Sequence, residues 1–353
     1  MIDSENSSRK SPLDCSDVHD PILEIRDLKT HFFLRSGTAK AVDGVHLTVH
    51  RRRTLGLVGE SGSGKSVTSL SILRLIRPPT GRIVAGEILY RRPGQGTVDL
   101  LSLDAECKQM RQIRGNEIAM VFQEPMTSLN PLYTVGRQLA ESIKVHERIG
   151  KHELNERVVS MLKKVGISDP APRARENPHH LSGGMRQRVM IAMALSCHPQ
   201  VLIADEPTTA LDVTVQAQIM DLLSALQADL GMGIIFITHN LGLIAQAADD
   251  VAVMYFGKVV EQADVKTLFE NPLHPYTNGL LKSVPVFGRK RKDLTPIAGR
   301  VPDSTEEITG CPYAPRCPRR MPICNRECPN LESVETKHSV ACWLHCRKAK
   351  AAG

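Results

Sequence analysis

The chain has 353 residues, of which 41% are hydrophobic and 24% are charged, and its formal net charge is +7. This length and apolar content suffice to bury the cores of two or three domains, and they exclude a wholly disordered protein. No segment contains the about 18 to 20 consecutive apolar residues that a membrane-spanning helix needs, so we expect any membrane contact to be made through a partner.

The chain opens on a polar, Ser-rich segment without the apolar run of a signal peptide, which predicts a disordered leader over residues 1–20. Short apolar or alternating runs follow at residues 22–33, 41–49 and 54–59, separated by turn residues. Runs of this kind are typical of β-strands. We therefore expect a β-rich entry to an α/β domain.

The stretch GESGSGKS follows the third of these runs and fits the pattern G-x-x-x-x-G-K-[ST]. Glycines let backbone N–H groups wrap a phosphate chain closely, and the N-terminus of the helix that follows adds its positive dipole end. Lys65 is expected to reach the β- and γ-phosphates, and the Ser66 hydroxyl to bind Mg²⁺. The pattern predicts a phosphate-binding loop made of Gly59, Glu60, Ser61, Gly62, Ser63, Gly64, Lys65 and Ser66.

Residues from about 105 to 195 are mostly helical in pattern, and apolar strand runs return at residues 201–205, 233–239 and 251–256. This order predicts a sheet interrupted by a helical insertion. The run VLIADEP places two carboxylates at the end of a buried strand, where open α/β sheets bind their ligands. Asp205 suits Mg²⁺, and Glu206 suits a general base that polarises a water molecule attacking the γ-phosphate.

A second anion-binding helix start is predicted by LSGGM, in which Ser182, Gly183 and Gly184 open a helix. One nucleotide hardly needs two such sites. We therefore expect this one to serve the nucleotide held by another subunit, with two subunits facing each other head to tail.

Beyond about residue 265, Pro and Cys become frequent and the periodicity fades, which predicts a domain boundary between residues 21–265 and 266–353. From Lys282 onward there are 14 Lys and Arg against 7 Asp and Glu, so this segment is basic. A basic segment suits nucleic acid or anionic lipid, and it equally suits a solvated tail.

Taken together, these motifs resemble the ATP-binding cassette (ABC) family: GESGSGKS, VFQEP, LSGGM, VLIADEP, TALD and ITHN occur in that order between residues 22 and 265. The resemblance implies an α/β P-loop core of the RecA type with an antiparallel β subdomain, a helical insertion and ATP hydrolysis. It implies that Gln123 senses the γ-phosphate and Mg²⁺, alongside the Mg²⁺ ligands Ser66 and Asp205. His239 would contact the γ-phosphate and the attacking water.

The resemblance implies further that Asp212 communicates across a dimer and that Phe32, or else Phe33, stacks on adenine. The chain departs from the family at two places. Arg52 and Arg53 stand where Gly-Glu is usual, and Met185 stands where Gln is commoner in the signature.

The stretches EPMTSLNPLYTVGRQ and NPLHPYTNGLLKSVP, followed by a cysteine-bearing tail, resemble the ATPase subunits of oligopeptide, dipeptide and nickel importers, most of all the D-type subunit of dipeptide importers. The resemblance implies a second ABC ATPase subunit as heterodimer partner, two membrane permeases, a periplasmic or extracellular substrate-binding protein, and no nucleic acid. It implies a peripheral position on the cytoplasmic face of the inner membrane. The segment after Gln123 would dock the permease.

Six of the nine cysteines lie in the last 43 residues. Without an export signal, disulfides explain them poorly. The spacing of Cys311, Cys317, Cys324 and Cys342 resembles an iron–sulfur motif of dipeptide-importer ATPases, which implies a [4Fe–4S] cluster. Zinc and free thiols remain alternatives, because the pairs Cys324/Cys328 and Cys342/Cys346 have gaps that zinc also uses.

The cysteine segment would give the chain a small Cys-rich C-terminal domain. We expect Arg316, Arg319, Arg320 and Arg326 to offset the cluster's negative charge, and we expect the phosphate site not to need this segment. Two other functions compete with the importer: a soluble cassette ATPase that acts on ribosomes or DNA, and an iron–sulfur redox sensor in which nucleotide binding is ancillary.

Overall fold

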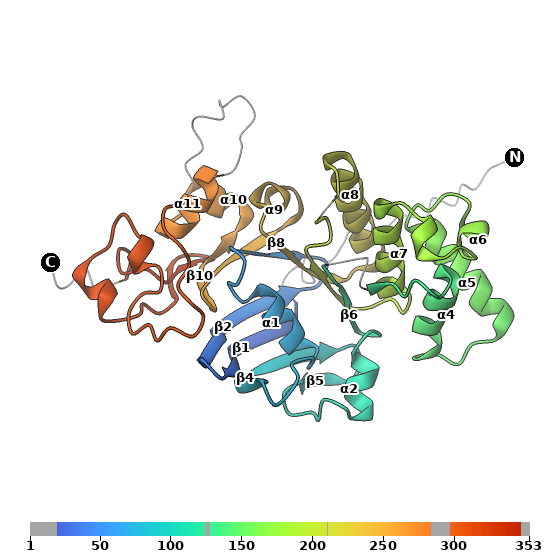
Figure 1. Cartoon of the computed structure of the whole chain (residues 1–353), viewed down its shortest axis with the longest axis horizontal. Helices are drawn as coiled ribbons and strands as arrows, with labels where there is room; N and C mark the ends of the chain where they lie inside the picture. The colour runs from blue at the N-terminus through green and yellow to red at the C-terminus, as the bar shows by residue number, and fades with distance from the viewer. Residues whose placement is uncertain (1–19, 124–127, 210, 284–296, 347–353) are drawn as a thin grey trace, which may run out of the picture.

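The computed structural model describes residues 20–123, 128–209, 211–283 and 297–346. The predicted leader, apart from Asp20, lies outside the described residues. Figure 1 shows two sheets joined near the middle of the molecule, with most helices gathered on the side away from the smaller sheet. None of the helices in the described ranges is both long enough and apolar enough to cross a membrane.

The smaller sheet is antiparallel, with strand order β2-β1-β4-β5. Its strands are β1 (Pro21–Leu34), β2 (Gly37–His50), β4 (Gly81–Arg92) and β5 (Gly96–Asp99). Side chains from β1 and β2 pack with β3, β7 and β8 of the larger sheet in one continuous core. This sheet is the antiparallel subdomain that the resemblance implied. Two of the three strand runs predicted at the start of the chain form β1 and β2 in it, and the third forms β3 of the larger sheet.

The larger sheet has eight strands in the order β11-β12-β10-β9-β3-β8-β7-β6. The five strands from β9 to β6 are parallel to one another. All residues of β3, β7 and β8 are buried, which is why these strands read as continuous apolar runs. The strands are β3 (Thr54–Val58), β6 (Ile118–Val121), β7 (Val201–Asp205), β8 (Gly233–Thr238), β9 (Asp250–Tyr255), β10 (Lys258–Asp264), β11 (Glu332–Glu335) and β12 (His338–Val340).

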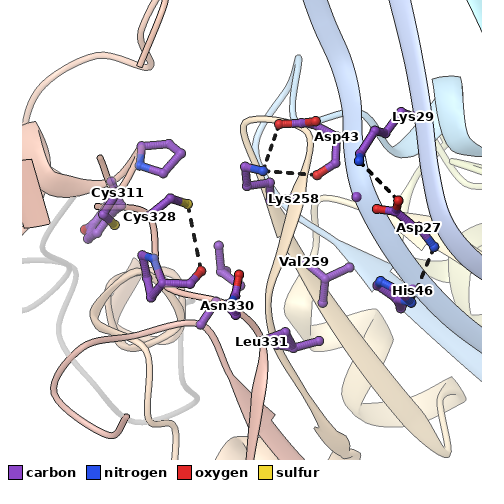
Figure 2. A pocket seen from close by; sticks show the side chains of 16 residues that line it. Asp27, Lys29, Asp43, His46, Lys258, Val259, Cys311, Cys328, Asn330 and Leu331 are labelled. Carbon is purple, nitrogen blue, oxygen red and sulfur yellow. Dashed lines mark hydrogen bonds and ion pairs between the residues drawn. The ribbon is translucent and has the colours of Figure 1, made fainter. Parts of the chain in front are cut away.

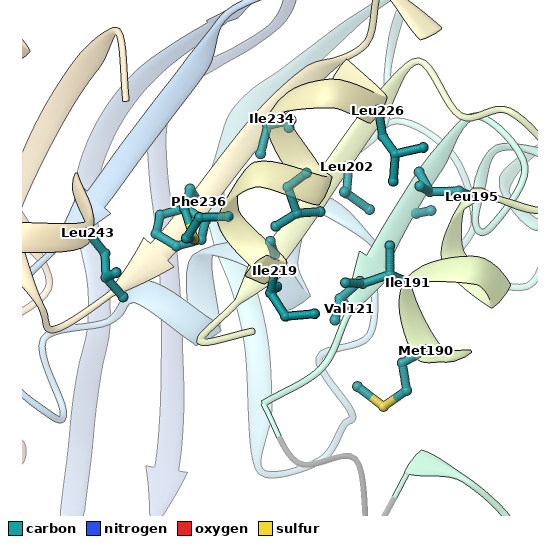
Figure 3. Close-up of a cluster of buried hydrophobic side chains, with 14 of the residues drawn as sticks. Val121, Met190, Ile191, Leu195, Leu202, Ile219, Leu226, Ile234, Phe236 and Leu243 are labelled. Atoms are coloured by element: carbon teal, nitrogen blue, oxygen red, sulfur yellow. The ribbon is translucent and has the colours of Figure 1, made fainter. Parts of the chain in front are cut away.

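Helices α7 and α8 cover one face of this sheet. Ile191 of α7 and Ile219 of α8 point toward Leu202, Phe236 and Val121 on the strands (Figure 3). The α-helices are α1 (Lys65–Ile72), α2 (Lys108–Ile113), α4 (Val135–Lys144), α5 (Lys151–Lys164), α6 (Pro170–Arg173), α7 (Gly183–Leu195), α8 (Val213–Leu230), α9 (Leu241–Ala247), α10 (Val265–Glu270) and α11 (Pro275–Ser283).

The range expected to be helical, residues 105–195, also contains strand β6. This strand pairs in parallel with β7 and ends the sheet. Helix α2 packs through Met110 and Ile113 into the core shared by the two sheets. The helices that pack on one another as a separate group are α4, α5, α6 and α7.

Arg52 and Arg53, which stand where Gly-Glu is usual, form a turn before β3. Arg52 has a φ of 57°, in the left-handed region that glycine adopts without strain. Arg53 donates two hydrogen bonds, each of 3.1 Å, to the carboxylate of Asp250 at the start of β9. The second arginine therefore ties β3 to its neighbour in the sheet.

The cysteine segment is joined to the larger sheet. Strand β12 pairs with β10, so the C-terminal residues extend the main sheet. Ala314, Cys324, Trp343 and Cys346 form a small core of their own beside it. The strands that make this connection have three and four residues, too few to show a pattern in the sequence.

Glu261 of β10 joins these parts. Its side chain is completely buried and accepts hydrogen bonds from the backbone N–H groups of Leu273 (2.7 Å) and His274 (2.9 Å). Its Oε1 also lies 2.9 Å from Nε2 of His338 on β12. One carboxylate thus links the residues just before α11 to strand β12.

Replacing Glu261 by Ala is expected to lower the free energy of unfolding by about 3 kcal/mol, because two backbone donors and an imidazole lose their buried acceptor. The urea midpoint of the purified chain measures this loss. Glu270→Ala, at an exposed position on α10, is the control and should change stability by less than about 0.5 kcal/mol. Equal midpoints for the two variants would contradict the anchoring role of Glu261.

Candidate functional site

The predicted nucleotide-site residues lie at the ends of four neighbouring parallel strands. The phosphate loop follows β3, Gln123 follows β6, Asp205 ends β7, and His239 follows β8. Because these strands are parallel, their carboxyl ends meet at one edge of the sheet, which is where open α/β sheets bind ligands. The four motifs, spread over the sequence, therefore face one site.

The glycines of the phosphate loop are required by close backbone packing. Gly64 has a φ of 103°, and a Cβ atom built on it would lie 2.3 Å from the carbonyl oxygen of Ala41. A Cβ atom on Gly59 would lie 2.2 Å from the carbonyl oxygen of Met254. Gly62, with a φ of 78°, has open space around the same position. The loop is thus fixed at both ends and open at its tip.

Lys65, the first residue of α1, points back along the loop. Its Nζ donates to the carbonyl oxygens of Gly59 (2.8 Å) and Glu60 (2.9 Å) and to Oγ of Ser63 (3.3 Å). Burial lowers the pKa of Lys65, and the nearby carboxylates, that of Glu206 foremost, oppose this shift. The ammonium group thus lies inside the loop and near both acidic residues.

Glu206 is the centre of the site. Gln123 Nε2 donates to its Oε2 at 2.8 Å, and the Thr209 hydroxyl donates to the same oxygen at 2.9 Å. Nδ1 of His239 lies 3.1 Å from Oε1. Burial alone would raise the pKa of Glu206, but the hydrogen bonds from His239 and Thr209 outweigh it and the pKa is lowered. The group is therefore a carboxylate at neutral pH.

Asp205 is buried, and its Oδ1 has no hydrogen-bond partner. Burial raises the pKa of Asp205, with the charge of Glu206 acting in the same direction, and a hydrogen bond from Ser66 opposes both. A buried acceptor without a partner, next to a hydroxyl group, fits Mg²⁺, which takes one or two protein oxygens and completes its shell with phosphate and water.

The signature residues lie on another part of the surface. Ser182 caps α7, and its hydroxyl accepts a hydrogen bond from the Met185 N–H at 3.3 Å. Ser182 and Gly183 are exposed, Gly184 is half-buried, and α7 lies well away from α1 in Figure 1. Asp212 caps α8 through a hydrogen bond from the Val215 N–H at 3.0 Å.

The aromatic residues lie on β1. Phe32 is half-buried, and its ring packs so closely on Gly81 of β4 that a Cβ atom there would lie 2.9 Å from a ring carbon. Phe33 is 46% exposed, and the Arg82 guanidinium lies 5.7 Å from its ring centroid. Phe33 therefore offers more open ring surface than Phe32.

Sequence reasoning missed three residues that contact the site. Thr209 donates a hydrogen bond to the Glu206 carboxylate. Two others contact Glu60 of the phosphate loop: the Tyr276 hydroxyl accepts from its N–H, and Arg316 donates to its carboxylate. The cysteine segment therefore contacts the phosphate loop through Arg316, a contact that was not expected from the sequence. The Arg316 charge is directed at Glu60, 256 positions earlier, and no local pattern could have indicated this pair.

Some of the four candidate cluster cysteines contact or influence one another. The Cys311 N–H donates to the Cys324 carbonyl oxygen at 2.8 Å. Burial raises the pKa of Cys311 to about 12 and that of Cys342 to about 11, and Cys324 adds to both shifts. Cys317 interacts with Cys324 and Cys342 in the same way. Within the described ranges, no three His, Cys, Asp or Glu side chains are arranged to hold a metal ion.

A cavity of about 400 Å³ lies between this segment, β10 and the antiparallel sheet (Figure 2). Charged side chains that line the cavity form ion pairs with one another. Lys258 Nζ donates to the Asp43 carboxylate at 2.8 Å, and Lys29 Nζ donates to the Asp27 carboxylate at 3.1 Å. The cavity has no residue in common with the site around Glu206.

Comparison with known proteins agrees with this geometry. Residues 42–209 match the family described as ABC transporter, and residues 260–324 match the oligopeptide/dipeptide transporter C-terminal region. A putative peptide import ATP-binding protein of Brucella ovis is 52% identical over 91% of this chain and 96% of its own length. The dipeptide transport ATP-binding protein DppD of Bacillus subtilis is 47% identical over 94% of this chain and 97% of its own.

Solved structures of a bacterial ABC transporter cassette, MJ0796, are also similar. Its dimeric structure superposes with a TM-score of 0.60 at 26% identity, covering 69% of this chain and 98% of the cassette. A second structure of the same cassette, in a post-hydrolysis state with ADP and phosphate, gives a TM-score of 0.59 at 25% identity over the same shares.

Proposed function

The chain belongs to the ABC transporter ATPases and carries the C-terminal region of their oligopeptide/dipeptide branch, and from this premise we propose that it powers the import of peptides through membrane permeases. The observation that carries the proposal is the set of contacts around Glu206, where Gln123, Thr209 and His239 meet one carboxylate beside the phosphate loop. The relatives named above give the transported class; neither they nor the site select one peptide.

In the proposed mechanism, Glu206 accepts a proton from the water that attacks the γ-phosphate. His239 and Gln123 hold that carboxylate in place and contact the water and the γ-phosphate. Lys65 turns from the loop carbonyl oxygens to the β- and γ-phosphates. Mg²⁺, held by Ser66 and Asp205 with Gln123 nearby, would neutralise charge on the phosphates. Phe32 remains our candidate for adenine stacking, with Phe33 as its more exposed neighbour.

We assign Ser182, Gly183, Gly184 and Asp212 to the nucleotide of a second ATPase subunit. The exposure of Ser182 and Gly183 at the start of α7 supports this, since a helix N-terminus is an anion site. The partner is proposed to be a similar but different ATPase, so that the two subunits form a heterodimer closing over two ATP molecules. Nucleic acid is not part of this assembly.

Permease docking is supported by an apolar groove of about 330 Å³ beside β6, between the sheet and the helical group. Phe122 and Val145 at this groove are 43% and 72% exposed. Large exposed apolar side chains around a groove are typical of contact surfaces. Two permeases and a substrate-binding protein would complete the importer, and the chain would lie peripherally at the cytoplasmic face of the inner membrane.

We propose that residues 266–353 form a C-terminal unit whose Cys311, Cys317, Cys324 and Cys342 hold a [4Fe–4S] cluster. Its support is the spacing of the four cysteines in a basic segment, together with the hydrogen bond from the Cys311 N–H to the Cys324 carbonyl oxygen. Binding would need the thiols to ionise and turn toward one another. Anaerobic purification followed by iron and acid-labile sulfide analysis tests this; about one zinc and no sulfide would exclude the cluster, and Cys346→Ser should retain it.

Co-purification tests the importer function. An affinity-tagged chain expressed in its own cell should bring down two hydrophobic permeases and a second ATPase from solubilised membranes. The assembly should hydrolyse ATP faster when its substrate-binding protein carries peptide. Recovery of ribosomes or DNA without permeases would favour the soluble cassette ATPase that acts on ribosomes or DNA. A redox response without ATP-dependent transport would favour the sensor.

A further inference from the structure

Glu60 is the only residue of the phosphate loop whose side chain forms an ion pair within the described ranges. Its carboxylate receives two hydrogen bonds from Arg316, Nη1 to Oε2 at 2.6 Å and Nη2 to Oε1 at 3.0 Å. The Arg316 side chain is 4% exposed and that of Glu60 is 28% exposed. A bidentate pair of this kind fixes the direction of the carboxylate as well as its distance.

Arg316 is itself held in place by its surroundings. Its Nε donates to the Ala298 carbonyl oxygen at 3.1 Å, and Nη1 lies 3.4 Å from the Tyr255 hydroxyl. The guanidinium carbon lies 5.8 Å and 5.9 Å from the ring centroids of Tyr255 and Tyr313. Planar contacts with aromatic rings suit arginine in particular. The position of the guanidinium group is therefore fixed by contacts other than its ion pair with Glu60.

A second contact from the same region reaches the backbone of Glu60. The Glu60 N–H donates to the Tyr276 hydroxyl at 2.9 Å. Tyr276 is fully buried on α11, and its own N–H donates to Nδ1 of His274 at 3.0 Å. Both the side chain and the peptide group of Glu60 are thus tied to residues beyond the cassette core.

The Glu60 carbonyl oxygen belongs to the machinery of the loop. It accepts hydrogen bonds from Nζ of Lys65 at 2.9 Å and from the Ser63 N–H at 3.2 Å. The Glu60 N–H shares its peptide plane with the Gly59 carbonyl oxygen, which accepts a hydrogen bond from Lys65 Nζ at 2.8 Å, so turning that peptide would move an acceptor that aims the ammonium group. Turning the next peptide, which carries the Glu60 carbonyl oxygen, would open the turn at Ser63. The loop geometry therefore depends on Arg316 and Tyr276.

We propose that Arg316 and Tyr276 of the C-terminal region are positioning residues for ATP, acting through Glu60 on the phosphate-binding loop. This inference deepens the proposed function and rests on it. Neither residue touches the nucleotide; each keeps the loop in the shape that receives the phosphates. The C-terminal region is thereby a working part of the ATP site.

The test measures the KM and kcat of ATP hydrolysis by the purified transporter, and the Kd of the full chain for MgATP. Arg316→Gln should raise KM and Kd about tenfold, with kcat changed less than about twofold, because the loop holds the phosphates equally in the ground state and the transition state. Tyr276→Phe should raise KM about fivefold. Arg300→Gln, an exposed arginine in the same region, should leave all three constants unchanged.

The double variant Glu60→Gln with Arg316→Gln should be no worse than Arg316→Gln alone, since both remove one pair. The proposal would be overturned if the effects of the two single variants on KM multiplied in the double variant. It would also be overturned if Arg316→Gln had the same KM and Kd as Arg300→Gln. If Arg316→Gln does not fold, Tyr276→Phe and Arg316→Lys carry the test, and unchanged KM in both would overturn it too. Absence of hydrolysis in the wild-type transporter would instead refute the proposed function itself.

Discussion

Replacing Glu206 by Gln is expected to lower ATP turnover by about 10²-fold or more, because the substituted amide cannot accept a proton from water. The side chain keeps its size, and its oxygen can still accept from Gln123 or Thr209, so the site should stay folded. ATP binding should change little. The variant subunit should therefore accumulate in the ATP-bound, closed assembly, which size-exclusion chromatography with labelled ATP would detect.

The measurement is phosphate release by the assembled complex at saturating MgATP. Single-turnover hydrolysis of the nucleotide bound at this site separates it from turnover at the partner's site. Glu270→Gln, at an exposed position, provides the control. Turnover within about twofold of wild type at this site would refute the assignment of Glu206 as the base.

Replacing Gly64 by Ala is expected to abolish most ATP binding. The residue has a φ of 103°, and the new methyl group would lie 2.3 Å from the Ala41 carbonyl oxygen, so backbone must move on one side or the other. The strain and the overlap together cost about 3 kcal/mol, equivalent to a rise in Kd of about 100-fold if the loop moves.

Gly62→Ala is the matched comparison for this variant. It is also left-handed, with a φ of 78°, but no atom lies within 4 Å of the added methyl group. Only the conformational strain of about 1 kcal/mol should remain, and the thermal midpoint should fall less than for Gly64→Ala. Titration with a fluorescent nucleotide measures the Kd of both variants, and thermal unfolding measures their midpoints. Equal Kd values would show that the contact with Ala41 does not shape the loop.

The meeting of the predicted nucleotide-site residues at one sheet edge was largely predictable, because they lie in contiguous motifs with a chemical reason for each residue. The loop from Gly59 to Ser66 and the pair Asp205–Glu206 each follow a run of buried residues, and parallel strands bring such ends together. What no motif indicated is the network around Glu206. Thr209 lies three residues beyond it and reads as one more polar residue in a turn.

Strand β6 and the C-terminal strands were missed for a different reason. Each has three or four residues, and pairing with an existing sheet edge stabilises strands that would have no stability alone. The pair of Arg53 with Asp250 likewise depends on two strands meeting in the sheet. Such contacts follow from tertiary structure, and a single sequence carries no periodic signal for them.

The ion pair between Glu60 and Arg316 also sets an order of events during synthesis. Chains fold from the N-terminus as they leave the ribosome, so the loop emerges long before the arginine that completes it, 256 positions later. A nascent cassette therefore carries a loop whose carboxylate lacks this arginine until residue 316 has been made. On the role proposed for Arg316, the loop reaches its final shape only once the C-terminal region has folded against it, well after the strands that carry the loop.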